Sequence, residues 1–240
     1  MEKLRLVERI QLKMKAVKLL KFMIELHGYN KISEALGLPQ SVISRYINGH
    51  VLPRWSRTLE ILELSRRMFS LSSLIKKRII IDENGYIDNT RILGDTDLLS
   101  LIADYVYDLY KDEGITKILT AAVDGIPLAT LIAERFGVGL AIAKKEKEIG
   151  VKKFYEEVLI LPDSGLTIGF YLPRRALSKR DRVLIVDDLI RSGWTQKVLI
   201  NFVKKVGASL VGIFVILVIG DDWRRNLSIE EDLVRFLLKL

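Results

Sequence analysis

The sequence contains no cysteine, and its only two histidines, His27 and His50, stand far apart in the chain. The first absence excludes disulfide bonds and thiolate metal sites, and the second excludes a histidine-rich zinc cluster. The most apolar run, "LVGIFVILVI", has about half of the roughly 20 residues that a membrane helix requires. The first residues, "MEKLRLVERI", are charged and lack the apolar core of a signal peptide. We therefore expect a cytoplasmic protein with no membrane partner.

Positive charge is concentrated in the first third of the chain. Residues 1–78 hold 16 Lys and Arg against 6 Asp and Glu, whereas the remainder holds 22 against 24. An excess of positive charge on a small module favours a polyanionic partner, because neutralised phosphates release counterions. A solvated helical face that serves only solubility would carry the same charge. The charge alone therefore leaves both interpretations open.

The basic module has the pattern of a small helical bundle. Apolar residues recur at helical spacing over 16–28. The segment 30–53 predicts two short helices, the first capped by Asn30 and separated from the second by a tight turn at Gly37. A further helix over 55–69 would close the core.

The second short helix has polar residues and no acids on its predicted outer face. These residues are Gln40, Ser41, Ser44, Arg45 and Asn48. Such side chains reach base edges and phosphates when a helix lies in the major groove of DNA. The segment 16–66 resembles the helix-turn-helix of lambda-repressor-like regulators. We therefore expect an all-α helix-turn-helix domain that binds double-stranded DNA, with an ordinary helical hairpin as the alternative.

A structured connection follows the helical module. Asn84-Gly85, between "RIIID" and "YID", is a strong signal for a two-residue β-hairpin turn. We expect one domain over 1–75 and a second over 76–240, with the hairpin connection at about 76–95.

Helix and strand signals alternate from residue 96 onward. The predicted strands cover 115–123, 138–145, 181–188 and 208–219, and the predicted helices cover 96–114, 127–137 and 195–207. Strands that are apolar throughout are typical of a parallel sheet covered on both faces by helices. Such α/β folds bind ligands at the carboxyl ends of their strands.

Two adjacent acids, Asp187 and Asp188, end one of these strands within "VLIVDDLIRSGWT". Carboxylates can accept hydrogen bonds from sugar hydroxyls, and a turn at a helix N-terminus presents N–H groups to a phosphate. The combination suits a ribose 5-phosphate, although acids that only cap the helix and form the turn are an alternative. We expect both acids at the exposed strand end, outside the core.

The same stretch resembles the phosphoribosyl pyrophosphate (PRPP) signature of type I phosphoribosyltransferases. The resemblance implies that Asp187 and Asp188 face the ribose hydroxyls. It also implies a cradle for the 5-phosphate made by Arg191, Ser192, Gly193, Trp194 and Thr195. In that family Mg²⁺ is carried with PRPP, so we expect no metal site held by the protein alone.

A second segment, 121–145, is similar to the pyrophosphate loop, helix and strand of that family. The resemblance places Asp124 and Gly125 in the loop, and Lys144 and Lys145 before a flexible loop within 146–180. Two positions depart from the family pattern. Trp194 replaces a small residue, and Asp124 puts a carboxylate where pyrophosphate approaches, a cost that Mg²⁺ or Lys144 would have to offset.

Together the two modules resemble archaeal transcription regulators of this composition. We expect a homodimeric DNA-binding regulator whose phosphoribosyltransferase-like domain senses PRPP or a related nucleotide or nucleobase, without catalysis. The alternative is an active type I phosphoribosyltransferase of nucleotide metabolism with a DNA-binding appendage. A third hypothesis is a DNA-binding protein whose ligand site is vestigial.

Overall fold

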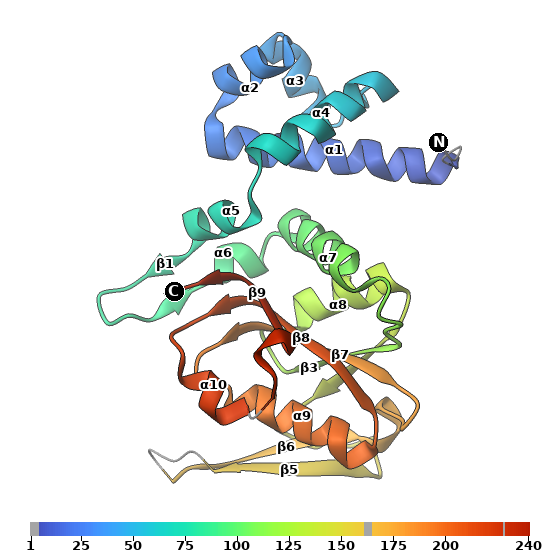
Figure 1. Cartoon of the computed structure of the whole chain (residues 1–240), viewed down its shortest axis with the longest axis vertical. Helices are drawn as coiled ribbons and strands as arrows, with labels where there is room; N and C mark the ends of the chain where they lie inside the picture. The colour runs from blue at the N-terminus through green and yellow to red at the C-terminus, as the bar shows by residue number, and fades with distance from the viewer. Residues whose placement is uncertain (1–4, 161–164, 228) are drawn as a thin grey trace. The chain divides into compact units, whose positions relative to one another are not determined.

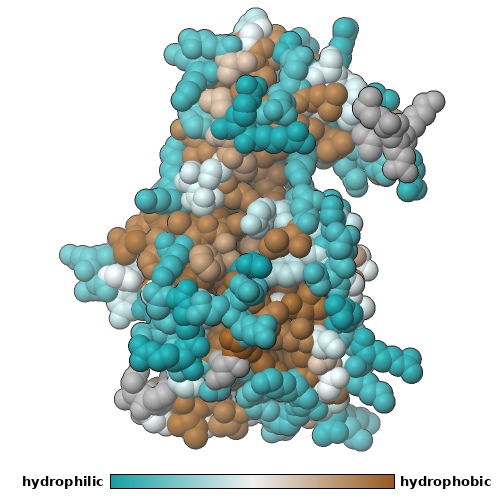
Figure 2. Space-filling model, in the orientation of Figure 1, coloured by the Kyte–Doolittle hydropathy of each residue, from teal (hydrophilic) through white to brown (hydrophobic). Residues whose placement is uncertain are grey.

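The structure is a computed structural model that describes residues 5–160, 165–227 and 229–240. The chain divides into two compact units, Met1–Ile79 and Ile80–Leu240 (Figure 1). On the face in view in Figure 2, hydrophilic and hydrophobic side chains are interspersed over both units. Among the helices of the described residues, none combines the length and the apolar character needed to cross a membrane.

The first unit is helical, as predicted. Its helices are α1 (Leu6–His27), α2 (Tyr29–Leu36), α3 (Gln40–Ile47), α4 (Trp55–Met68) and α5 (Leu71–Arg78). Their core is apolar and includes Leu20, Met23, Ile32, Ile43 and Ile61. Gly37 ends α2 in the left-handed conformation that a tight turn requires. Asn30 is not the cap of α2, because α2 begins one residue earlier and Gly28 both ends α1 and precedes α2.

The second unit is built on a five-stranded sheet in the order β4-β3-β7-β8-β9, with all neighbouring strands parallel. The strands are β3 (Lys117–Ala121), β4 (Gly139–Ala143), β7 (Arg182–Ile190), β8 (Ser209–Val218) and β9 (Val234–Lys239). The predicted α/β fold with a parallel sheet is therefore confirmed. The edge strand β9 was not predicted.

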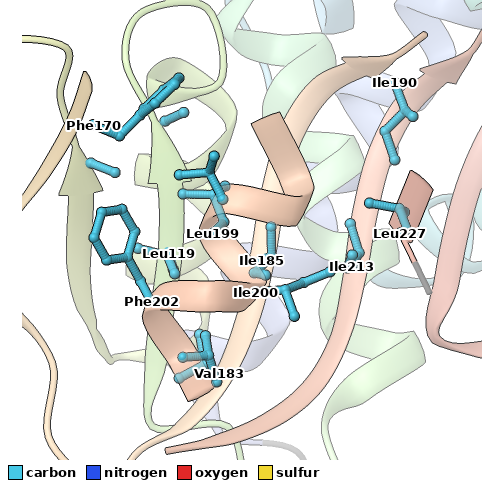
Figure 3. Packing of buried hydrophobic residues seen from close by; sticks show 14 of the residues in the cluster. Leu119, Phe170, Val183, Ile185, Ile190, Leu199, Ile200, Phe202, Ile213 and Leu227 are labelled. Atoms are coloured by element: carbon cyan, nitrogen blue, oxygen red, sulfur yellow. The ribbon is translucent and has the colours of Figure 1, made fainter. Parts of the chain in front are cut away.

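Helices cover the sheet (Figure 1). They are α7 (Thr96–Tyr110), α8 (Ile126–Phe136) and α9 (Trp194–Val206). Figure 3 shows Leu199, Ile200 and Phe202 of α9 packed against strand residues such as Ile185 and Ile213. Burial of these apolar side chains is the main force that holds α9 on the sheet. The start of α9 is thereby fixed beside the end of β7.

Smaller elements complete this unit. They are β1 (Ile80–Ile81), β2 (Ile87–Asp88), α6 (Thr90–Leu93), β5 (Phe154–Ile160), β6 (Thr167–Pro173), α10 (Asp222–Leu227) and two 3₁₀ turns at Arg174–Ala176 and Glu231–Leu233. β1 and β2 form the predicted hairpin, with Gly85 at a φ of 77° in its turn. β5 and β6 form an antiparallel pair within the segment predicted to hold the flexible loop. Residues 161–164 of that loop lie outside the described residues.

Candidate active site

A cavity of about 290 Å³ lies within the second unit, at the carboxyl ends of β3 and β7. Its lining residues are Ala121, Ala122, Val123, Asp124, Lys145, Phe170, Asp187, Asp188, Leu189, Arg191, Ser192, Gly193, Trp194, Thr195 and Gln196. This is the edge of a parallel sheet where ligands are expected to bind. The residues singled out within β7 and after β3, β4 and β7 thus converge on one cavity, apart from Lys144 and Gly125.

The turn between β7 and α9 presents the start of a helix to this cavity. Gly193 adopts a φ of 80°, which glycine tolerates better than any other residue. The first N–H groups of a helix lack carbonyl partners within the helix and carry the positive end of its dipole. Asn226 of α10 donates from Nδ2 to the Ser192 carbonyl oxygen over 2.8 Å and so holds the turn from outside. The turn can therefore bind an anion such as a phosphate.

Trp194 does not obstruct this turn. It is the first residue of α9, and its half-buried ring packs against the hydrophobic core of the unit. The Lys197 ammonium lies 4.9 Å from the centre of the indole. The side chain is thus engaged along α9, which leaves the backbone of the turn to face the cavity.

Asp187 and Asp188 are buried, with 6% and 7% of their surface exposed. The prediction that they lie at an exposed strand end was wrong, because β7 is a central strand and polar side chains close over both acids. Asp187 accepts a hydrogen bond from Gln196 Nε2 at 2.7 Å, and Asp188 accepts one from Asn89 Nδ2 at 2.7 Å. Each acid nonetheless lines the cavity.

Burial controls the electrostatics of this pair. Loss of hydration raises the pKa of Asp187 well above its usual value, and the neighbouring Asp188 charge raises it further. Burial also raises the pKa of Asp188, against the opposing effect of hydrogen bonds from Asp187 and Asn89. The site therefore holds two closely coupled carboxyl groups that gain from a ligand able to donate hydrogen bonds to them.

Gly125 lies in the loop between β3 and α8, pressed against the end of β7. A Cβ atom at this position would lie 2.6 Å from Asp187 Oδ1, so a side chain cannot be accommodated without moving the loop. Asp124, the preceding residue, is exposed and lines the cavity. The loop thus brings a third carboxylate to the same cavity.

The two lysines after β4 have different surroundings. Lys145 lines the cavity. Lys144 forms an ion pair with Glu148, and its backbone pairs with Tyr171 of β6. Only Lys145 is therefore in a position to face a ligand in this cavity.

Sequence reasoning missed Gln196, Asn89 and Phe170. A signal existed for Gln196, because it shares a helical face with the apolar Leu199, Ile200 and Val203, where a polar residue stands out. Asn89 is 99 residues from the acid that it contacts, and no local pattern marks it.

The residues predicted to bind DNA belong to the first unit. Gln40, Ser41, Arg45 and Asn48 are exposed on or next to α3, and Ser44 is half-buried. Gln40 donates to Asn30 and Asn48 donates to Ser44, so part of this polar surface is paired within the unit.

Comparison with known proteins identifies a family. The model of the phosphoribosyl transferase domain matches residues 89–234. A xanthine phosphoribosyltransferase of Macrococcus caseolyticus is 30% identical over 153 residues, which cover 62% of this chain and 79% of that protein. One of Staphylococcus carnosus is 33% identical over 123 residues, covering 51% of this chain and 64% of that protein, which is less than two thirds of its length. The crystal structure of an adenine phosphoribosyltransferase from Rhodothermus marinus superposes with a TM-score of 0.62 at 25% identity, covering 71% of this chain and 98% of that one.

These relatives overturn the prediction of a DNA-binding transcription regulator without catalysis. They are named as phosphoribosyltransferases and favour the alternative, an enzyme of nucleotide salvage. The basic charge and the acid-free face of α3 do not distinguish a DNA-binding surface from a solvated helical face, because both have the same composition. Double-stranded DNA as a partner is withdrawn with it, and the expected homodimer is not shown by these comparisons.

The family match covers more than half of the chain, and it includes every segment that lines the cavity. The order of strand, loop, helix and acid pair within that match is the order predicted from "VLIVDDLIRSGWT" and from residues 121–145. The chain belongs to the phosphoribosyltransferase domain family.

Proposed function

We propose that the second unit is an active phosphoribosyltransferase that transfers the phosphoribosyl group of PRPP to a purine base. The observation that carries the proposal is the buried Asp187–Asp188 pair beside the turn at the start of α9, within one cavity. In the reaction, the bond from C1 of the ribose to pyrophosphate breaks, and a bond from C1 to a ring nitrogen of the base forms. The proton of that nitrogen leaves to solvent. Purines are proposed because the relatives carry the names xanthine and adenine phosphoribosyltransferase.

We assign the cavity residues to parts of PRPP as follows. Asp187 and Asp188 accept hydrogen bonds from the ribose hydroxyls. The 5-phosphate is held by backbone N–H groups of the turn together with the side chains of its polar residues, in the segment Arg191, Ser192, Gly193, Trp194 and Thr195. Pyrophosphate lies near Asp124, Gly125 and Lys145. Catalysis then depends chiefly on orientation of the ribose by fixed groups, since the transfer needs no dedicated acid–base pair.

Mg²⁺ is proposed to enter with PRPP and not to reside in the protein. Among the described residues, no group of three or more His, Cys, Asp or Glu side chains could hold a metal ion. The acids that line the cavity, Asp124, Asp187 and Asp188, are hard oxygen donors that suit Mg²⁺ if PRPP supplies further ligands. When bound, the ion neutralises charge on the departing pyrophosphate.

An assay of pyrophosphate release tests the function. The full chain is incubated with PRPP and Mg²⁺ and with each of xanthine, hypoxanthine, guanine, adenine, uracil and orotate. We expect release with at least one purine, and a loss of about two or more orders of magnitude in the Asp187→Asn/Asp188→Asn variant, since each charge-assisted hydrogen bond contributes roughly 1.5–3 kcal/mol. If the wild-type chain releases pyrophosphate no faster than this double variant with any of the bases, the proposal is refuted.

Two architectural assignments are proposed alongside the function. We propose that α2 and α3 form a helix-turn-helix in the structural sense, supported by the left-handed turn at Gly37 between them. We also propose that the two compact units are separate domains, with the boundary near residue 79. Expression of residues 80–240 alone tests the second assignment: a cooperative melting transition with retained pyrophosphate release is expected.

A further inference from the structure

The charge of the cavity is unusual for a site that would take a polyphosphate. Three of its lining residues are acids, Asp124, Asp187 and Asp188, and two are bases, Lys145 and Arg191. Lys144, the other candidate to offset the acids, is paired with Glu148. The lining thus carries more acidic than basic groups, whereas PRPP brings several negative charges of its own. Like charges brought into one cavity repel each other.

The two ends of the cavity differ in this respect. Arg191 and the start of α9 lie after β7, where the 5-phosphate is proposed to bind. Asp124 and Lys145 lie after the neighbouring strands β3 and β4, at the proposed pyrophosphate end. One lysine and one carboxylate line the cavity at that end. This end alone offers no excess of positive charge to a pyrophosphate.

Hydrogen bonds hold the backbone of the loop that carries Asp124. The Ala122 N–H donates to the Ala143 carbonyl oxygen at 2.9 Å, and the Ile126 N–H donates to the Val123 carbonyl oxygen at 3.1 Å. Gly125 is in turn pressed against Asp187. These contacts fix the backbone on both sides of Asp124 at this end of the cavity.

We propose that Asp124 is a specificity-determining residue, which makes the pyrophosphate end of the cavity accept pyrophosphate only together with a divalent cation. The carboxylate repels bare PRPP and offers an additional oxygen ligand to a cation that PRPP carries. The turn at the start of α9 has no such acid, and a purine nucleoside 5′-monophosphate therefore binds without a cation. The inference rests on the proposed function, because it uses the assignment of the two ends of the cavity.

Calorimetry on the full chain tests this inference. PRPP and adenosine, inosine and xanthosine 5′-monophosphates are each titrated in Mg²⁺ and in EDTA, with the wild-type chain and with Asp124→Asn. Asp112→Asn is the matched control, since Asp112 is an exposed acid of the same unit that does not line the cavity. For PRPP we expect the affinity ratio between Mg²⁺ and EDTA to fall about tenfold in Asp124→Asn, through tighter binding in EDTA, and to stay unchanged in Asp112→Asn. The ratio for the monophosphate that binds is expected to be near one in all three proteins.

The outcomes separate the inference from the proposed function. Binding of PRPP with the same Mg²⁺ dependence in wild type and Asp124→Asn would overturn the role of Asp124 and leave the enzyme assignment standing. A monophosphate that needs Mg²⁺ as strongly as PRPP does would also overturn it. If the wild-type chain binds neither PRPP with Mg²⁺ nor any of the monophosphates, the proposed function and the inference both fail.

Discussion

Gln196 is a buried amide that fixes the orientation of a buried acid. Only 3% of its surface is exposed, and its Nε2 group donates to Asp187 Oδ2 at 2.7 Å. A carboxylate that is removed from water gains much more from such a donor than an exposed one does. Gln196 is therefore a positioning residue for Asp187, and it does not itself have to contact the ribose.

Replacement of this amide tests the positioning role. Gln196→Met keeps the length of the side chain but removes the donor, and we expect it to weaken binding of PRPP with Mg²⁺ by about tenfold or more. Gln196→Glu should weaken it further, because it adds a carboxylate next to two buried acids. Asn201→Ala is the control on the same helix, since Asn201 donates to Glu157 outside the cavity. Equal affinity in Gln196→Met and wild type, measured by calorimetry, would exclude the role.

At the level of elements, the short helix α10 supports the turn that precedes α9. Trp223 and Leu227 of α10 are buried, and both lie where a Cβ atom on Gly193 would be, at 3.1 and 3.2 Å. Asn226 of the same helix donates to the Ser192 carbonyl oxygen. The geometry of the anion-binding turn thus depends on a helix that follows β8 in the chain.

Gly193→Ala tests this dependence, and Gly220→Ala is its matched control. Both glycines have positive φ, 80° and 61°, so alanine is strained at both. A Cβ atom on Gly220 meets nothing within 4 Å, whereas one on Gly193 lies 3.1–3.2 Å from Trp223 and Leu227 of α10, which is tighter than an ordinary contact. We expect Gly193→Ala to lose binding of a purine nucleoside 5′-monophosphate by tenfold or more, roughly 1.4 kcal/mol, and to melt at a lower temperature than Gly220→Ala. Similar melting temperatures and nucleotide affinities in the two variants would contradict the role of α10.

The elements that could be predicted from the sequence are those with a strong local pattern. The strands that became β3, β4, β7 and β8 are apolar runs between helical periods, and the structure has each within a few residues of its predicted range. The edge strand β9, "VRFLLK", has a short and mixed pattern that does not distinguish it from a helix or a loop. Contacts across long sequence separations, such as Asn89 to Asp188, have no local pattern at all.

At the scale of the whole molecule, composition indicated two different parts but misjudged the function. The charge excess of the first 78 residues is real. Such a charge excess is shared by many solvated helical surfaces, whereas an acid pair before an anion-binding turn is not. The chemistry of a site therefore indicates function more specifically than the net charge of a module does.

The buried acid pair has a consequence for the stability of the unliganded protein. The pKa of Asp187 is raised in the folded state by burial and by the Asp188 charge. Below the pKa of an unfolded aspartate, about 4, both states hold the proton and burial costs little. As the pH rises through the window between that value and the raised pKa, the unfolded state loses its proton more readily. The contribution of Asp187 to the free energy of unfolding therefore falls across this window and stays low at neutral pH.

Asp187→Asn removes this penalty, so we expect the unliganded variant to melt above wild type at pH 7 by about 2–4 °C, the shift that roughly 1 kcal/mol gives in a chain of this size. The amide oxygen of the new side chain can still accept from the Asp188 N–H, which donates to Asp187 Oδ1 over 3.1 Å. Rotation of the Gln196 amide would let Gln196 accept from the new amide group. The rotation gives up only the longer hydrogen bond, 3.4 Å, from Gln196 Nε2 to the Leu189 carbonyl oxygen. The difference in melting temperature between the two proteins should shrink as the pH approaches 4. At pH 7 it should reverse when PRPP and Mg²⁺ are added, because only wild type gains stability from the ligand. Melting curves of both proteins across this pH range test the prediction. If the variant melts below wild type at pH 7 without ligand, Asp187 stabilises the fold, and the inferred cost of its burial to the stability of the unliganded protein is refuted.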